Sequence, residues 1–306
     1  MRARLRSSAS LALLVVFVLG GRLGHASPAR SLPPFLAAVT PTYLLEAQLS
    51  ILNSKNQKKA WKPVWFCNNF DAKGRVVSSP ECLAAASKTG HFCAIQNLTD
   101  GQWNPATVEQ DPTAVSESVS EFVKNSRCQY LLIDIESLNL SDKTKFTAWI
   151  GIVSAKLKKK QKRLSIGLAV HAKTDAKGSW QGAEAQDWKA LCKPVDELVI
   201  MAYDYHYPGA TEPGETAPID WFEKVMRFGI ASCPRQKLRL GLAAYGYQWP
   251  AKSVITERQA FAPQAILPLW IETQEKREQK IARAKKYRIR KFFLWALGME
   301  KLPSSK

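Results

Sequence analysis

The sequence predicts a single-domain α/β protein, a closed (β/α)8 barrel of the TIM type with short insertions in its βα loops. Eight short, apolar, β-rich runs recur along the chain. Stretches with helix-type apolar spacing separate them, and this alternation favours a parallel sheet. The 306 residues suit one such barrel, which needs about 250. An open, doubly wound sheet is the competing arrangement, but no Gly-rich phosphate-binding loop follows an early run.

Each apolar run marks one expected strand of the barrel. Helical spacing between the runs is clearest over Val115–Val123, Thr144–Leu157 and Glu272–Tyr287. The barrel domain is expected over residues 35–302, with no internal repeat and no second domain. In chain order the expected strands are Phe35–Thr40, Val64–Asn68, His91–Asn97, Tyr130–Glu136, Leu164–His171, Leu198–Asp204, Leu238–Tyr245 and Phe292–Leu297.

The first 26 residues have the pattern of a cleavable secretion signal. Arg2, Arg4 and Arg6 precede an apolar stretch, and the segment ends in small residues at Ala26. A membrane span is the alternative, but it needs roughly 20 apolar residues, about twice the length of this stretch. We therefore expect residues 1–26 to be removed and residues 27–34 to begin the mature chain. The product is expected to be a secreted monomer, extracellular or periplasmic, without membrane contact.

The chain is strongly basic, because 44 Lys and Arg residues outnumber 26 Asp and Glu residues for a formal net charge of +18. Two basic runs, Lys156–Arg163 and Lys276–Lys291, contribute most to this excess. Attraction to an anionic cell envelope is one interpretation of the runs. The other is a solvated face of outer helices, because Ile281 and Ala284 fall at helical spacing among the charges. No nucleic-acid-binding motif accompanies either run, so nucleic acid is not an expected partner.

Six cysteines in an exported chain permit three disulfides, but fifteen pairings are open and the sequence does not choose among them. The chain has no CxxC pair or Cys/His cluster, and its four histidines are scattered. We therefore expect no metal site.

Two carboxylates stand at the end of the fourth run. Side chains alternate along a strand, so Leu132, Asp134 and Glu136 share a face that can point into a barrel. Burial of two carboxylates there favours one shared proton, as a general acid near neutral pH requires. A catalytic pair at the C-terminal rim is one interpretation. A structural pair that caps a loop or binds a Lys is the other.

The sixth and eighth runs bring further side chains to the same rim. Met201, Tyr203 and Asp204 end the sixth run, and Trp295 lies in the eighth. The hydroxyl and the carboxylate could bind a ligand or form an ordinary strand-to-loop junction. The indole could be the floor for a sugar ring or a core residue.

Taken together, these segments resemble glycoside hydrolase family 18. The similarity runs from about residue 35 to residue 300, nearly the whole mature chain. A narrower similarity, to the spore-germination and cortex-lytic N-acetylglucosaminidase branch, is carried by Gln96–Gly101 and by the loop from Tyr203 to Gly209. The segments that carry the family resemblance are Asp134-Ile135-Glu136, Met201-Ala202-Tyr203-Asp204, Tyr245-Gly246-Tyr247 with Trp249, and Trp295.

The resemblance implies a retaining glycosidase that cleaves β-1,4 bonds of N-acetylglucosamine polymers, in peptidoglycan or chitin oligomers. In such enzymes the 2-acetamido oxygen of the substrate is the nucleophile. By this resemblance Glu136 protonates the leaving oxygen and later activates water. Asp134 orients the acetamido group and stabilises the oxazolinium, and Tyr203 donates to the acetamido oxygen. This scheme uses no cofactor and no metal.

The resemblance also implies a set of substrate-binding residues. Asp204 would bind near the reacting ring, Trp295 would lie beneath it, and Met201 would pack under it. Tyr245 and Asn97, from the other matching segments, complete the set. The expected partner is an N-acetylglucosamine-containing polysaccharide.

The chain departs from the family pattern in two places. The fourth strand of the family reads D-x-x-D-x-D-x-E, and Gln129 and Leu132 occupy its first two acidic positions. Leu132 offers no hydrogen bond, so we expect Asp134 to stay coupled to Glu136 and turnover to be slower or its pH optimum shifted. The stretch after Trp249 is short, which predicts a shallower groove. A catalytically weak sugar-binding protein is the alternative function, although the presence of Glu136 argues against it; a basic envelope or nucleic-acid scaffold is the third.

Overall fold

The computed structural model describes residues 32–40, 61–86, 92–209, 212–249, 253–260 and 269–300. They belong to one compact unit that starts at Leu32. The predicted leader, residues 1–26, lies outside the described residues, as does most of the 27–34 segment, so these boundaries stay predictions. Within the described ranges, no helix combines the length and the apolar character that a membrane crossing requires.

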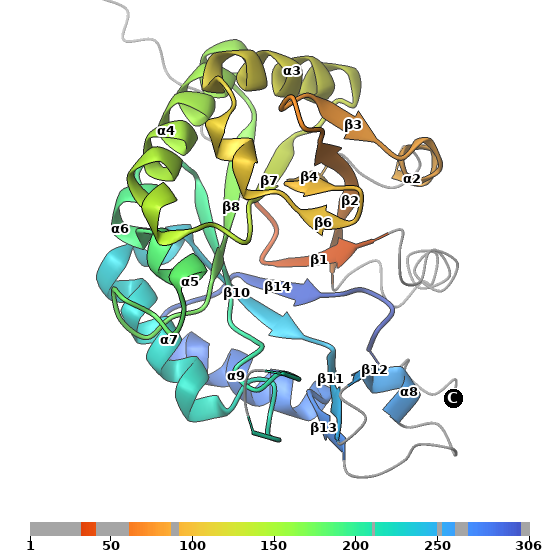
Figure 1. Cartoon of the computed structure of the whole chain (residues 1–306). Coiled ribbons are helices and arrows are strands. Elements are labelled where there is room, and N and C mark those ends of the chain that lie inside the picture. The colour runs from red at the N-terminus through yellow and green to blue at the C-terminus, as the bar shows by residue number, and fades with distance from the viewer. Residues whose placement is uncertain are drawn as a thin grey trace, which may run out of the picture. The chain divides into compact units, whose positions relative to one another are not determined.

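Eight parallel strands form a closed barrel (Figure 1). Each strand pairs with the next around the ring, and the pairing of β1 with β2 closes it. This confirms the predicted fold class. Around the ring the strands are β1 (Phe35–Val39), β14 (Phe292–Trp295), β10 (Leu238–Ala243), β9 (Glu197–Met201), β8 (Ser165–His171), β7 (Tyr130–Asp134), β4 (Phe92–Gln96) and β2 (Lys62–Phe70).

Helices between the strands pack on the outside of the barrel, most of them along the left and lower sides of the view in Figure 1. The α3 helix illustrates why they form: Asp111 caps its first turn by accepting from the backbone N–H groups of Thr113 and Ala114, and Pro112 starts it. Its buried residues recur at helical spacing, as the apolar pattern predicted. The described α-helices are α2 (Pro80–Ala86), α3 (Pro112–Asn125), α4 (Lys143–Lys160), α5 (Gln181–Ala185), α6 (Trp188–Leu191), α7 (Ile219–Ser232), α8 (Glu257–Ala260) and α9 (Gln274–Lys286).

Three shorter features decorate the barrel. β3 (Val76–Ser78) extends β2 in the antiparallel sense, and β5 (Leu98–Thr99) pairs with β6 (Gln102–Trp103). After β10 the chain forms a small antiparallel sheet in which β11 (Tyr245–Gln248) lies between β12 (Ser253–Thr256) and β13 (Leu269–Ile271). The sequence predicted one strand through residue 245, whereas the chain leaves the barrel at residue 243 and starts a second sheet. Single 3-10 turns occur at η2 (Pro105–Glu109), η3 (Leu140–Asp142) and η4 (Arg235–Lys237).

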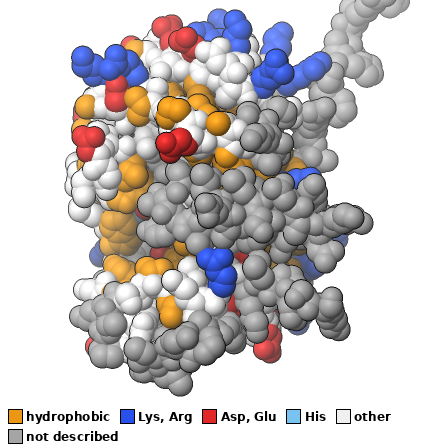
Figure 2. All heavy atoms as spheres, turned by 90° about the vertical axis from the view of Figure 1, so that its right-hand side faces the viewer, with side chains coloured by type: hydrophobic (Ala, Val, Ile, Leu, Met, Phe, Trp, Pro, Cys, Tyr) orange, Lys and Arg blue, Asp and Glu red, His pale blue; other side chains and the backbone are white. Residues whose placement is uncertain are grey.

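The core fills the barrel interior and the layer between strands and helices. Trp65, Trp149 and Trp188 are among its largest buried side chains. Some apolar side chains stay at the surface: on the face drawn in Figure 2 they gather in groups, and most visible Lys and Arg side chains lie toward its upper edge.

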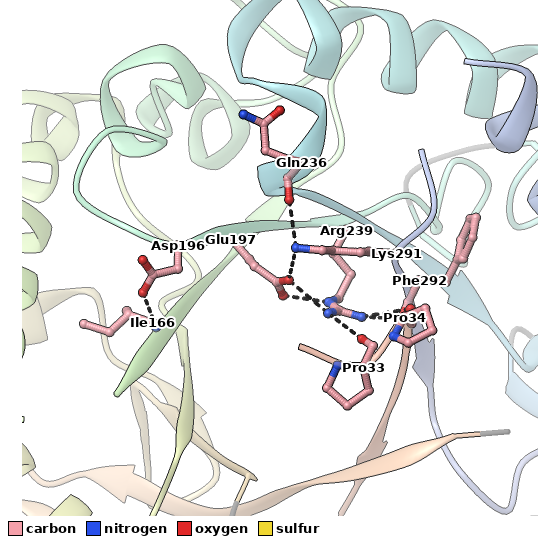
Figure 3. A network of polar contacts seen from close by, with 9 residues as sticks. All are labelled: Pro33, Pro34, Ile166, Asp196, Glu197, Gln236, Arg239, Lys291 and Phe292. Atoms are coloured by element: carbon pink, nitrogen blue, oxygen red, sulfur yellow. Dashed lines mark hydrogen bonds and ion pairs between the residues drawn. The ribbon is translucent and has the colours of Figure 1, made fainter. Parts of the chain in front are cut away.

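A buried ion pair closes the N-terminal end of the barrel (Figure 3). Arg239 and Glu197 have no exposed surface, and the guanidinium binds both carboxylate oxygens at 2.8 and 3.0 Å. Its remaining N–H donors bind the backbone carbonyls of Pro33, Pro34 and Phe292. All five donors of the guanidinium are therefore used. The pair ties β9 and β10 to β14 and to the segment that enters β1.

All six cysteines form disulfides, which chooses one of the fifteen pairings that the sequence left open. Cys67 pairs with Cys82, Cys93 with Cys128, and Cys192 with Cys233, over Cα–Cα distances of 5.5, 6.1 and 5.9 Å. Each pair joins neighbouring elements of the barrel layer. Such cross-links suit an oxidising compartment.

Candidate active site

A cleft of about 950 Å³ lies at the C-terminal ends of the barrel strands. This is the end of a (β/α)8 barrel where the loops that follow the strands build binding sites. Of the eight side chains predicted from the sequence to act in the site, seven line it: Asp134, Glu136, Met201, Tyr203, Asp204, Tyr245 and Trp295. Asn97 does not.

Asn97 has a structural role instead of the predicted contact with substrate. It is fully buried, and its side-chain amide donates to the backbone carbonyls of Asn104 and Glu136 at 3.0 and 2.9 Å. Its carbonyl oxygen accepts from the backbone N–H of Glu136 at 2.8 Å. Both backbone groups of Glu136 are thus held by one amide. Asn97 fixes the segment from which the Glu136 side chain enters the cleft.

Asp134 is a buried carboxylate that accepts one hydrogen bond from the described residues. Gln96 donates to Oδ2 at 3.0 Å, while the buried Oδ1 has no hydrogen-bond partner in the described ranges. Leu132, two positions earlier on the same face, is buried and apolar and cannot donate. Burial raises the pKa of Asp134 to about 6, although the hydrogen bond from Gln96 acts in the opposite direction.

The surroundings of Glu136 favour its protonated form. Burial raises its pKa well above the ordinary value, and the negative charges of Asp134 and Asp204 add to the effect. His171 Nε2 lies 3.7 Å from Glu136 Oε2. Burial lowers the pKa of His171 to about 4, so the imidazole is neutral at pH 7 and the contact is not an ion pair.

Two tyrosine hydroxyls bind Asp204, the third carboxylate of the cleft. The hydroxyls of Tyr245 and Tyr247 donate to Asp204 Oδ1 at 2.6 and 2.8 Å. These bonds lower the pKa of Asp204, but burial is the larger influence and raises it. Asp204 has a positive φ of 62°, a conformation that Asp tolerates better than most residues. Tyr245, predicted to bind substrate, therefore lines the cleft while it orients Asp204.

Tyr203 can present its ring to the cleft because Gly241, on the neighbouring strand β10, has no side chain. A Cβ at Gly241 would lie 2.9 Å from the Tyr203 ring and 2.7 Å from a backbone carbonyl. Burial, together with the nearby carboxylates, raises the pKa of Tyr203 well above its ordinary value. The phenol is therefore a hydrogen-bond donor, not a phenolate. Trp295, at the end of β14, also lines the cleft and packs edge-to-face on Phe66, with ring centroids 5.1 Å apart.

The loop after β8 adds residues that the sequence reading missed. Trp180 is 42% exposed and packs edge-on against His171, with centroids 4.7 Å apart. Gln186 accepts from the backbone N–H of His171 and donates to the carbonyl of Ile135. Lys173 is buried and donates to the carbonyls of Ala176, Ala183 and Gln186. These contacts fix His171 and Trp180 beside Glu136.

In the part of the chain that the structure describes, no three His, Cys, Asp or Glu side chains gather in a group that could hold a metal ion. The cleft thus offers three carboxyl groups of raised pKa, one of which is bound by phenols, and a phenol donor. This set can donate a proton and stabilise an adjacent positive charge.

Comparison with known proteins identifies the family. The model for glycosyl hydrolases family 18 matches residues 96–300, more than half of the chain. The chain belongs to this family. The match includes every cleft-lining residue named above, and it confirms the resemblance predicted from the sequence.

Two Bacillus subtilis proteins are similar to this family 18 chain. The putative sporulation-specific glycosylase YdhD is 32% identical over 164 residues, which cover 52% of this chain and 38% of YdhD. The cortical fragment-lytic enzyme is 26% identical over 162 residues, which cover 51% of this chain and 37% of that enzyme. The chain therefore matches less than two-fifths of the length of either relative.

Solved structures share the family 18 fold. A chitinase from Chromobacterium violaceum has a TM-score of 0.74 at 20% identity, covering 87% of this chain and 95% of that one. The spore cortex-lytic enzyme SleL of Bacillus cereus has a TM-score of 0.73 at 18% identity, covering 87% of this chain and 71% of that one. At these identities the likeness concerns the fold.

Proposed function

We propose that this family 18 chain is a retaining glycosidase that cleaves β-1,4 bonds next to N-acetylglucosamine by substrate-assisted catalysis. One observation carries the proposal. Glu136, whose pKa burial raises well above its ordinary value, lines the same cleft as Asp134 and the phenol of Tyr203. Substrate-assisted hydrolysis needs these three groups: a proton donor, a carboxylate beside the acetamido group, and a hydrogen-bond donor to its oxygen.

In the first step the glycosidic bond breaks. Glu136 transfers its proton to the glycosidic oxygen, and the acetamido carbonyl oxygen attacks C1 from the opposite face. The C1–O bond breaks, the leaving sugar departs with the proton, and a positively charged oxazolinium forms. Asp134 accepts a hydrogen bond from the acetamido N–H and offsets the positive charge. Tyr203 donates to the acetamido oxygen and holds it in line for attack.

In the second step water opens the oxazolinium. The Glu136 carboxylate, now ionised, takes a proton from water as the oxygen attacks C1. The bond from C1 to the acetamido oxygen breaks, and Glu136 is protonated again. Two inversions at C1 leave the product with the starting configuration. The proton balance closes without a further donor.

The remaining cleft residues suit a sugar ring near the reacting carbon. The Trp295 indole can pack against the C–H face of the sugar, with Met201 beneath. Asp204, held by the two tyrosine hydroxyls, can accept hydrogen bonds from ring substituents. Peptidoglycan is the proposed polymer and chitin oligomers the second, supported by the spore-germination-like segments and by the name of the cortical fragment-lytic relative. We place the protein outside the cytoplasm, as the leader pattern indicates.

Product analysis tests the proposal. The purified chain, incubated with muropeptides and with chitotetraose, should release reducing ends, and mass spectrometry should identify the cleaved bond. Glu136→Gln, which keeps shape but not acidity, should lower kcat by about 10²-fold or more. Proton NMR should show the β-anomer as the first product. Correctly folded wild-type protein without turnover on either substrate would remove the proposal.

Sugar binding without efficient hydrolysis is the second candidate, favoured by the unpaired Oδ1 of Asp134 beside Leu132. Because no side chain donates to this oxygen, Asp134 starts the reaction with a raised pKa and a weaker ability to stabilise positive charge. Tight oligosaccharide binding in calorimetry, together with product assays that detect no cleavage, would support this candidate.

A further inference from the structure

Several helices end at the face of the barrel opposite the cleft. Each leads into the N-terminal end of a parallel strand: α3 into β7, α4 into β8, α7 into β10 and α9 into β14. These helix ends therefore lie at one end of the barrel, and α3, α4, α7 and α9 follow one another around the strands (Figure 1). The exposed cations at the ends of α4 and α9 consequently lie at the same end of the barrel.

The second basic run divides into paired and free charges. It holds nine Lys and Arg residues between positions 276 and 291. Five of them form ion pairs with Glu side chains, including Arg277 with Glu257 and Lys280 with Glu272. The other four are exposed and have no acidic partner among the described residues. This α9 group consists of Lys285, Lys286, Arg288 and Arg290, at and beyond the end of the helix.

The first basic run has the same division. Lys158 pairs with Asp196 at 2.8 Å. Four cations at and beyond the end of α4 are exposed and meet no acid within the described ranges. This α4 group consists of Lys159, Lys160, Lys162 and Arg163. Cations within the last turn can be explained by the helix dipole, but that effect fades beyond the turn. Lys162 and Arg163 lie past the end of the helix, as do Arg288 and Arg290 in the α9 group.

The two acids at the start of β9 do not offset these groups. Asp196 pairs with Lys158, and Glu197 is enclosed by Arg239 and Lys291. The exposed cations of the α4 and α9 groups therefore face solvent, and these two acids do not neutralise them. Repulsion among them is relieved when a polyanion binds.

Two arginines follow helix ends in a backbone conformation that usually selects glycine. Arg127 after α3 has a φ of 53°, and Arg288 after α9 has a φ of 63°. A left-handed residue after a helix is most often Gly or Asn, because a larger side chain costs about 1 kcal/mol or more there. The chain thus carries cations on this face at positions where local stability favours glycine. This is the pattern expected when side-chain charge is needed.

Exposed apolar side chains distinguish a protein surface that binds a membrane from one that binds a polyanion in solution. A protein that inserts into lipid presents exposed aromatic or aliphatic side chains among its cations. None of the described large apolar side chains with high exposure lies at the helix ends of the α4 or α9 group. Those side chains are Val77, Leu140, Ile152, Trp180, Tyr205, Tyr207, Val254 and Trp270.

We propose that the basic face formed by the α4 and α9 groups binds a linear, phosphate-bearing polyanion and so holds the protein with its cleft turned away from that polymer. Lys and Arg bind phosphate oxygens through charge-assisted hydrogen bonds. The cations of the α4 and α9 groups are spread over one end of the barrel. Such a spread suits a flexible chain of repeating charges better than a single compact anion. Binding of this kind releases counter-ions and weakens steeply with salt.

The test uses the full mature protein and inorganic polyphosphate as probe. Affinity is measured by calorimetry over a series of NaCl concentrations. One variant changes the α4 group to Gln, and a second changes the α9 group to Gln. A matched control changes Lys73, Lys143, Lys177 and Lys224 to Gln, which removes the same charge from the loops and helix starts at the cleft end. Thermal unfolding shows that each variant folds.

We expect each basic-face variant to bind polyphosphate more weakly and to lower the salt slope by up to about four, roughly one for each lost contact. The control should bind like the wild type. Equal weakening in the control would show that only total charge matters and would overturn the proposal. Unchanged binding in both basic-face variants would do the same. Tighter binding to phosphatidylglycerol vesicles than to polyphosphate would identify a membrane partner instead.

Discussion

Asp134 sets the acid side of the proposed reaction because it must be ionised while Glu136 keeps its proton. Burial raises the pKa of Asp134 to about 6, so kcat/KM should rise as pH passes this value. Burial and the charges of Asp134 and Asp204 raise the pKa of Glu136 well above its ordinary value, and loss of its proton should end activity on the alkaline side of the profile. Leu132→Asn should place an amide donor beside the unpaired Oδ1. A hydrogen bond to the charged form lowers the pKa of Asp134, so the acid limb should move to lower pH.

A pH series of kcat/KM on chitotetraose checks this shift. Leu132→Met is the control, because it keeps an apolar side chain of similar volume. An acid limb that moves equally in both variants would mean that packing changes, and not the amide, control the pKa of Asp134.

Other site residues show what a sequence can and cannot indicate. Glu136, Asp134 and Tyr203 were predictable because strand alternation and the C-terminal rim of a barrel place them together. Asn97 was predicted to contact substrate, but it is fully buried and does not line the cleft. Its amide binds the backbone at residues 104 and 136, and only the fold brings these segments together. His171 was missed because a single histidine carries no spacing signal, and its 3.7 Å approach to Glu136 depends on neighbouring strands.

At the scale of elements, the buried pair of Arg239 and Glu197 links β9, β10 and β14 to the segment that enters β1. Arg239→Met should lower the free energy of unfolding by about 3–5 kcal/mol, because Glu197 loses the partner that neutralises most of its charge. Urea unfolding followed by circular dichroism measures the change. Lys291→Met is the matched control: Lys291 contacts the same carboxylate, but its side chain is 28% exposed, so about 1 kcal/mol or less is expected.

The double variant Arg239→Met, Glu197→Met separates charge from packing. Removing both charges leaves no uncompensated carboxylate, and stability should recover part of the loss. If the double variant is less stable than Arg239→Met alone, the Glu197 carboxylate stabilises the strands even without Arg239. The loss in Arg239→Met would then not come from leaving that charge unpaired.

Strand positions were predictable from apolar runs, and strand ends were not. The sixth run was expected to start at Leu198, but β9 begins at Glu197 because Arg239 makes burial of that carboxylate tolerable. The seventh run was expected to continue to Tyr245. β10 instead ends at Ala243, and the alternating Tyr245-Gly246-Tyr247 segment pairs with β12 and β13. Apolar content locates a strand, but side-chain partners from other strands decide where it stops.

At the scale of the whole molecule, the two ends of the barrel carry different groups. The cleft end carries the carboxylates of the site, while exposed cations occupy the helix ends of the α4 and α9 groups. Cys192–Cys233 joins the ends of α6 and α7 near this basic face, and Cys93–Cys128 joins the starts of β4 and β7. The total charge was evident from composition, but the gathering of the α4 and α9 groups at one end required the parallel topology. The cysteine pairing likewise depended on which elements of the barrel layer become neighbours.

These cross-links make the proposed export testable in the folded protein. The Cys192–Cys233 disulfide closes a separation of 41 residues, so Cys192→Ser with Cys233→Ser should lower the free energy of unfolding by about 2–5 kcal/mol. Protein from an oxidising compartment should show no free thiol on titration after denaturation, because all six cysteines pair. Protein made in a reducing cytosol should show the thiols, and there the double Ser variant should unfold with the same midpoint as its parent. An exported protein with a full set of titratable thiols would contradict the pairing and the oxidising environment together, because disulfides at these separations form wherever the compartment allows.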